Sequence, residues 1–75
     1  MPRRPRYPLP EFMQQALSIR GLMDAYLARP AYQRNDYIGW ITRAKHEETQ
    51  EKRLCQMLDE LARGGIYMKM KWHPK

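Results

Sequence analysis

The residues best suited to chemistry gather in one polar stretch near the middle of the chain. No apolar side chain occurs from Lys45 to Arg53, where cations, carboxylates, a histidine and a hydroxyl group follow one another. Such a set favours recognition of a charged partner, or binding of an anion at the N-terminus of the helix that follows. The residues that we assign to this candidate interaction patch are Arg43, Lys45, Glu48, Thr49, Lys52 and Arg53.

The same stretch also fits an ordinary solvated connection between two helices. In that interpretation Thr49 caps the second helix, and Arg53 or Lys45 braces the turn. Residue types and spacing are the same in both interpretations, so both stay open at the level of the sequence.

Metal binding and catalysis have weaker support. His46 precedes two carboxylates, but adjacent residues do not face one another on a helix, and one histidine is not a closed ligand set. The single cysteine, Cys55, excludes an intrachain disulfide, and its apolar neighbours predict a buried, unreactive thiol. The sequence has no diagnostic Cys–His or Ser–His pair and no phosphate-binding glycine loop. We therefore expect a protein that is not an enzyme and that needs no cofactor or metal ion.

Helical periodicity and breaker residues predict the elements on either side of this stretch. A first helix should begin at Pro10 and break near Gly21, and a short second helix should continue to Pro30. One bent helix over both segments is the alternative. The apolar face expected on the first helix consists of Phe12, Ala16 and Ile19, with Met13 and Leu17 alongside.

Two further helices should enclose the polar stretch. One should run from about Tyr32 or Gln33 to Lys45, and the other should end at Gly64–Gly65, with a break near His46–Glu48. A continuous helix over residues 33–63 is the alternative. The expected core stripes are Tyr37, Trp40, Ile41 and Ala44, with Ile38 at the edge, and Leu54, Met57, Leu58 and Leu61.

The C-terminal segment changes to a period of two. Apolar and polar residues alternate from Ile66 to Trp72, which is typical of a half-buried strand. The chain offers no obvious second strand. We therefore expect an extended segment over the helices, or else one that pairs with the N-terminal segment or with its counterpart in a homodimer.

The net charge of +6 comes entirely from the two ends of the chain. Residues 1–8 and 66–75 each contribute +3, whereas residues 9–65 hold eight basic and eight acidic side chains. Basic ends with interleaved aromatic residues are compatible with sequence-nonspecific nucleic-acid binding. The contacts expected in that alternative are Arg3, Arg4, Arg6, Lys69, Lys71 and Trp72.

These observations predict an all-α fold, a small bundle of three to four helices that contains an antiparallel helical hairpin. Its organisation should be an extended, basic, proline-rich tail (1–8), a helical domain (9–65) and an extended, amphipathic, basic tail (66–75) with a possible short β-like strand. No apolar run approaches the roughly 20 residues that span a bilayer, and the N-terminus does not resemble a secretory signal. We expect a cytoplasmic protein.

The central segment resembles a known family. The residues Arg34, Tyr37, Ile38, Trp40, Ile41, Ala44 and Lys45, followed by Thr49, Lys52 and Arg53 and then a leucine-rich helix that ends in glycine, are similar to the pattern of the bacterial YdeI/OmpD-associated family. Gln50 stands where that family often has arginine. The resemblance implies a small helical domain and a link to bacteriocin protection. It implies no catalytic site, cofactor or ligand.

The function that we expect is therefore non-enzymatic. The chain should be a small interaction module that acts through a protein partner, with self-association through its C-terminal segment as a further expectation. Nucleic-acid binding by the two ends is the alternative.

Overall fold

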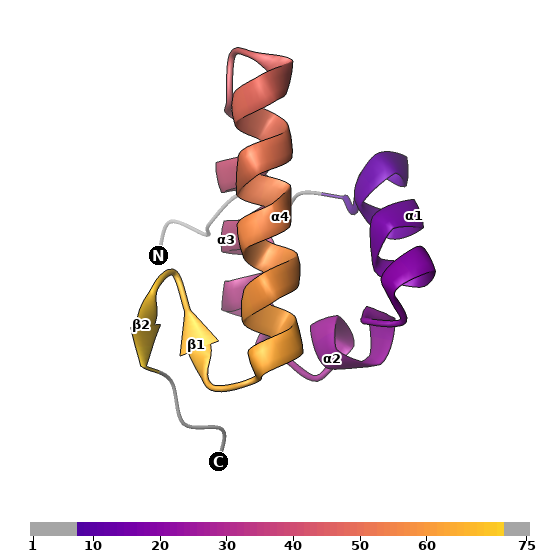
Figure 1. Cartoon of the computed structure of the whole chain (residues 1–75), viewed down its shortest axis with the longest axis vertical. Helices are drawn as coiled ribbons and strands as arrows, with labels where there is room; N and C mark the ends of the chain where they lie inside the picture. The colour runs from indigo at the N-terminus through magenta and orange to yellow at the C-terminus, as the bar shows by residue number, and fades with distance from the viewer. Residues whose placement is uncertain (1–7, 72–75) are drawn as a thin grey trace, which may run out of the picture.

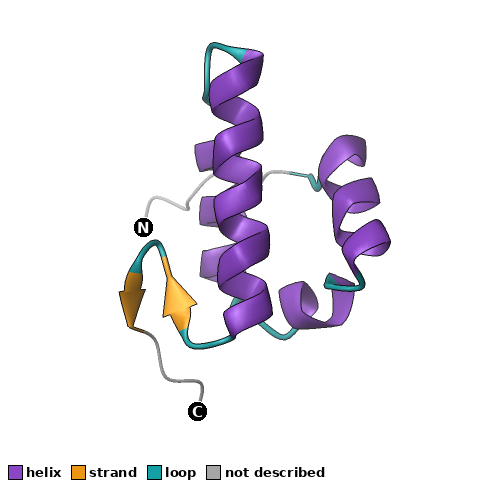
Figure 2. Ribbon diagram, in the orientation of Figure 1, coloured by secondary structure: helices purple, strands orange, loops and turns teal. Residues whose placement is uncertain are grey.

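Residues 8–71 form four helices, within the predicted three to four, and prolines and glycines mark most of the helix ends. The computed structural model describes residues 8–71. Figure 1 and Figure 2 show its elements, which are α1 (Glu11–Arg20), α2 (Met23–Leu27), α3 (Ala31–Thr42), α4 (Glu47–Arg63), β1 (Ile66–Tyr67) and β2 (Met70–Lys71). The prediction of a small, mostly helical fold is confirmed.

A proline or a glycine accounts for most of the helix ends. Gly21 follows α1 with a left-handed φ of 67°, and its N–H donates to the Ser18 carbonyl at 3.2 Å. Pro30 directly precedes α3, and Gly64 ends α4 with a φ of 81°. Glycine adopts such left-handed angles without a Cβ clash. Gly21 therefore separates α1 from α2. Residues 43–46, which include neither proline nor glycine, separate α3 from α4, and neither continuous-helix alternative holds.

The helices form two layers around one core. α3 and α4 lie side by side as an antiparallel hairpin, and α1 and α2 pack on one side of α4 (Figure 1). The connection between α3 and α4, residues 43–46, projects beyond α1 and α2 in this view. We call this connection, together with the first turns of α4, the α3–α4 corner.

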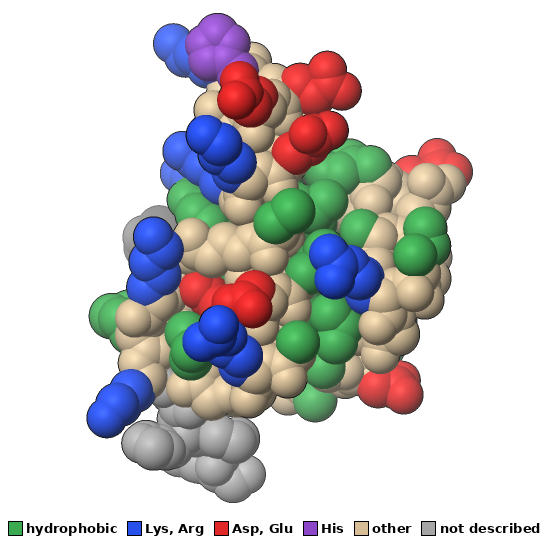
Figure 3. Space-filling view, viewed as in Figure 1, with side chains coloured by type: hydrophobic (Ala, Val, Ile, Leu, Met, Phe, Trp, Pro, Cys, Tyr) green, Lys and Arg blue, Asp and Glu red, His purple; other side chains and the backbone are tan. Residues whose placement is uncertain are grey.

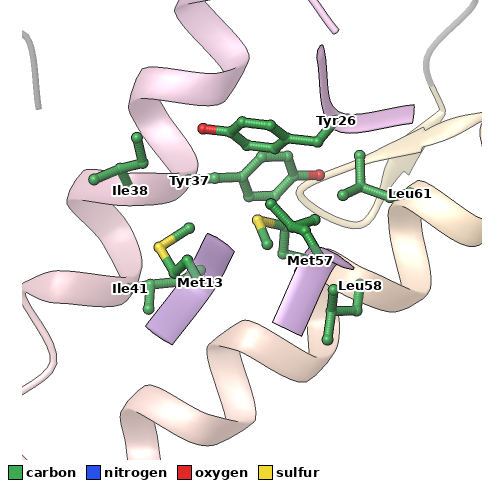
Figure 4. Packing of buried hydrophobic residues seen from close by; sticks show 9 residues of the cluster. Met13, Tyr26, Tyr37, Ile38, Ile41, Met57, Leu58 and Leu61 are labelled. Atoms are coloured by element: carbon green, nitrogen blue, oxygen red, sulfur yellow. The ribbon is translucent and has the colours of Figure 1, made fainter. Parts of the chain in front are cut away.

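The core contains most of the predicted apolar stripes. Its nine members are Met13, Leu17, Tyr26, Tyr37, Ile38, Ile41, Met57, Leu58 and Leu61 (Figure 4). The stripes on α3 and α4 are confirmed in part. Tyr37, Ile41, Met57, Leu58 and Leu61 are buried as predicted, and Ile38 is buried in the core rather than at its edge, whereas Trp40, Ala44 and Leu54 are only partly buried. On α1 the structure differs from the prediction, because Met13 and Leu17 are buried while Phe12 is 39% and Ile19 is 84% exposed.

Three polar side chains are buried with this core, and none was predicted to be there. Arg29, Gln33 and Glu60 are each at most 4% exposed. Arg29 donates to Gln33 Oε1 and to the main-chain carbonyl of Glu60, both at 3.1 Å. Among residues 8–71, no buried side-chain nitrogen or oxygen lacks a hydrogen-bond partner. The polar groups therefore avoid the penalty of unpaired burial.

The Glu60 carboxylate accepts four hydrogen bonds. Its Oε1 accepts from the Tyr37 hydroxyl and from the Met68 N–H at 2.8 Å. Its Oε2 accepts from Gln56 Nε2 at 3.0 Å and from the Lys69 N–H at 2.9 Å. Burial, followed by the hydrogen bond to Glu60 and its negative charge, raises the pKa of Tyr37 well above its usual value.

The C-terminal segment forms a hairpin instead of one extended strand. β1 pairs with β2 in antiparallel register, Tyr67 opposite Met70, and the turn residues Met68 and Lys69 have φ values of 50° and 65°. These left-handed angles cost non-glycine residues roughly 1–2 kcal/mol each. The bonds from both turn amides to the Glu60 carboxylate offset that cost.

Tyr67 attaches the hairpin to α3. Its ring meets the rings of Tyr37 and Tyr32 edge to face, with centroids 5.4 Å and 6.1 Å apart. Its hydroxyl donates to Asp36 Oδ2 at 2.8 Å. The hairpin thus packs against the helices through one aromatic side chain and one turn.

Candidate functional site

The end of α3 is closed by its own last side chains. Thr42 Oγ1 donates to the Ile38 carbonyl at 2.7 Å, and Arg43 Nε donates to the Gly39 carbonyl at 2.9 Å. The Gly39 carbonyl also accepts from the Arg43 N–H at 3.0 Å, so the Arg43 side chain adds a second hydrogen bond to a carbonyl that already has a main-chain partner. Arg43 also places a positive charge at the negative end of the helix dipole. α3 ends at Thr42, three residues earlier than expected.

Arg53 of α4 braces the corner. Its Nη1 donates to the Trp40 carbonyl, and its Cζ lies 5.4 Å from the centroid of the Trp40 ring. The guanidinium group thus makes a charged hydrogen bond and a cation–π contact to the same residue. The prediction that Arg53 braces the turn is confirmed.

α4 begins without a side-chain cap. His46 occupies the N-cap position with φ −106° and ψ 140°, and its side chain makes no capping hydrogen bond. Its carbonyl accepts from the Gln50 N–H at 3.0 Å. Thr49 lies inside the first turn and is half-buried, so the prediction that Thr49 caps this helix is wrong. Glu47 and Glu48 in the first turn instead face the positive end of the helix dipole.

The rest of the corner is exposed to solvent. Lys45, Glu48 and Lys52 are exposed, and within residues 8–71 no hydrogen bond or ion pair engages their side chains. Figure 3 shows basic side chains on one side of the corner and acidic side chains on the other. The surface that the corner offers is therefore divided by sign.

The structure thus separates the six predicted patch residues into two groups. Arg43 and Arg53, ten positions apart in the chain, both bond to carbonyls in the last turn of α3, and Thr49 is half-buried beside them. These three belong to the architecture of the corner. Lys45, Glu48 and Lys52 stay available to another molecule. The bracing role of Trp40 was not predicted, because it depends on a main-chain carbonyl and a ring face.

Of the six residues expected to contact nucleic acid, two lie in the described part of the chain. Arg3, Arg4, Arg6 and Trp72 lie outside the described residues. Lys69 and Lys71 are exposed on the β-hairpin. This alternative and self-association through the C-terminal segment both stay predictions.

Cys55 is exposed, so the prediction of a buried thiol is wrong. It lies two residues before the buried Met57, a rotation of about 200° around a helix with 3.6 residues per turn. Its side chain therefore points away from the core. Between residues 8 and 71 no three His, Cys, Asp or Glu side chains come together in a way that could hold a metal ion.

The helices of residues 8–71 include no candidate membrane span. No helix in this part of the chain combines the length and the apolar character needed to cross a bilayer.

The fold and its corner define a class of protein, namely a small helical module with a braced, charge-divided helical hairpin. Comparison with family models gives one match, to the family described as bacteriocin-protection, YdeI or OmpD-associated, over residues 6–64. The chain belongs to this family. The match includes the corner and ends before the β-hairpin. No curated protein and no solved structure matched the chain.

Proposed function

We propose that this chain is a non-enzymatic protein-interaction module that binds a protein partner through the α3–α4 corner. The observation that carries the proposal is the contrast between a fixed frame and free charges. Arg53 holds the corner to Trp40, while Lys45, Glu48 and Lys52 remain exposed and unengaged in the described part of the chain.

A braced frame favours recognition for an energetic reason. Ordering side chains and loops at an interface costs free energy, and a surface that is already ordered avoids part of that cost. Charges of both signs on one projecting corner would select a partner whose surface has the complementary division, because like charges placed opposite one another are unfavourable. This account predicts a polar contact whose specificity comes from charge placement.

Affinity capture from the native cell tests the proposal with three tagged full-length chains. The first is the wild type, and the second carries Lys45→Glu and Lys52→Glu. The third is a matched control, Arg20→Glu with Lys71→Glu, which has the same change in net charge at exposed positions away from the corner. Wild type and control should capture the same protein, and the corner variant should lose it.

Two results would contradict the proposal. One is retention of the partner by the folded corner variant. The other is the absence of any specific partner for a folded, monomeric wild type.

The description of the family also mentions bacteriocin protection, and we extend that role to this chain as part of the proposal. A strain without the chain should be more sensitive to bacteriocin, and the control variant should restore resistance where the corner variant does not. If both variants restore resistance equally, the corner has no role in protection. We also assign the chain to the cytoplasm, which fractionation of native cells would test.

A further inference from the structure

The β-hairpin has few attachments to the helices, and they are concentrated in a small area. The Glu60 carboxylate bonds the turn amides of Met68 and Lys69, and Tyr67 packs on α3. The outer strand is exposed, with Met70 62% exposed. Figure 1 shows the hairpin beside α4, on the side away from α1. The nine buried core residues all come from the helices, and the hairpin adds only Tyr67 and Met68, which are partly buried against them.

The hairpin is joined to α4 by two glycines that can act as a hinge, and the backbone of its turn is strained. Gly64, which ends α4 at a left-handed φ of 81°, and Gly65 connect it to α4. Its two turn residues hold left-handed angles that favour glycine, although neither is glycine. An isolated two-stranded hairpin is at best marginally stable in water. Its closed position thus depends on the contacts to Glu60 and Tyr67.

We propose that the β-hairpin is a strap that opens and closes as a unit over the α3–α4 face while the four helices stay packed. The hinge is Gly64–Gly65, and the catch is the Glu60 carboxylate. Opening uncovers the ring of Tyr37 and the carboxylate of Glu60, which the closed strap covers. The two strands lie beyond the residues matched by the family, whereas the catch Glu60 lies within them, and the device is separate from the corner and independent of the proposed function.

Native-state hydrogen exchange of the full chain, followed by NMR, tests the independence of the opening. The amides of Met68 and Lys69 should exchange at least about tenfold faster than core amides of α4, because local opening needs less free energy than global unfolding. Ile41→Val, a change in the core, should speed exchange of the core amides by roughly three- to tenfold. It should leave the two strap amides unchanged, because the open strap retains the core.

The alternative result is clear in the same experiment. If Ile41→Val speeds the strap amides by the same factor as the core amides, the hairpin opens only when the whole chain unfolds. That outcome would overturn the proposal.

Two further variants test the catch. Glu60→Gln should speed exchange of the Met68 and Lys69 amides by at least about tenfold, because one of them must then face an NH₂ group instead of an acceptor. The matched control Asp59→Asn removes the same charge from an exposed neighbour on α4 and should leave both rates unchanged. Unchanged strap amides in a folded Glu60→Gln variant would refute the role of the catch.

Lys69→Gly keeps the strap testable if Glu60→Gln does not fold. Glycine suits the left-handed angle at position 69, so the closed strap should be favoured and its amides should exchange at least about threefold more slowly. No change, or faster exchange, would contradict the account of the strap.

Discussion

Substitution of Arg53 by methionine tests the frame of the corner. Methionine keeps an unbranched side chain of similar reach and retains much of the packing of the arginine stem. It removes the hydrogen bond to the Trp40 carbonyl and the cation–π contact to the Trp40 ring. The perturbation is therefore confined to one residue pair that joins α4 to the end of α3.

The magnitude follows from these two contacts. A hydrogen bond from a charged group contributes about 1.5–3 kcal/mol, and a cation–π contact near the surface adds about 0.5–1 kcal/mol. Arg53 is half-buried, so water recovers part of the loss when the contact is removed. We expect Arg53→Met to lower the free energy of unfolding by about 1.5–3 kcal/mol, which corresponds to a fall in Tm of at least about 6 °C for a domain of this size.

Urea unfolding monitored by circular dichroism measures this loss against a matched control. Arg63→Met removes the same side chain from an exposed ion pair with Asp59, where both partners are at least 60% exposed. Such pairs contribute at most a few tenths of a kcal/mol, so the control should change stability little. If Arg53→Met costs no more than Arg63→Met, Arg53 does not brace the corner and the account of the site fails.

Three other predictions concern the rest of the chain. Burial raises the pKa of Tyr37, with Glu60 adding to the effect, and burial also raises the pKa of Tyr26. Stability should therefore be fully present below about pH 10 and fall above it, where the unfolded chain ionises and the folded chain does not. Gly21→Ala should cost about 1–2 kcal/mol in urea unfolding, because the φ of 67° is strained for alanine although no atom lies within 4 Å of the added Cβ. The exposed Cys55 should react with a maleimide in the native state, with the circular dichroism spectrum unchanged.

A specific result would contradict each of these three predictions. Phenolate absorbance that rises fully while the helical signal is intact would show that Tyr26 and Tyr37 are not held neutral by the fold. A neutral Gly21→Ala would mean that α1 and α2 do not need the left-handed break. Reaction of Cys55 only in denaturant would place the thiol inside the structure.

Most helix boundaries were predictable because their causes are local, whereas the end of α3 at Thr42 was not. Pro10, Gly21, Pro30 and Gly64 act through their own backbone preferences, which any surrounding structure must respect. The stripe of α4 followed for a similar reason, since this helix has one dominant apolar face. α1 offered two adjacent apolar faces, and packing against the other helices decided that Met13 and Leu17 are buried.

The β-hairpin was not predictable from local signals. Its turn has methionine and lysine where a tight hairpin turn normally has asparagine and glycine. The turn forms because Glu60, eight residues earlier than Met68, accepts hydrogen bonds from its amides. The burial of Glu60 itself depends on Tyr37 and Gln56 being in place, which is a property of the assembled fold.

The candidate patch was predicted as a group but not in its division of roles. The charged stretch indicated where the corner would be, and the bracing by Arg53 was one of two interpretations. Sequence spacing does not show that Arg53 reaches the Trp40 carbonyl, next to the Gly39 carbonyl that Arg43 bonds locally, since the Arg53 contact depends on the angle between two helices. Of the six patch residues, Lys45, Glu48 and Lys52 are the exposed ones whose side chains make no hydrogen bond or ion pair within residues 8–71, and the proposed function assigns recognition to them.

The most direct test of that claim is the affinity of the captured partner, measured by titration calorimetry. Lys45→Glu combined with Lys52→Glu should weaken binding at least about tenfold, or about 1.4 kcal/mol, while Arg20→Glu with Lys71→Glu should change it less than about twofold. Equal affinities for the two folded variants would contradict the assignment of the α3–α4 corner as the binding site.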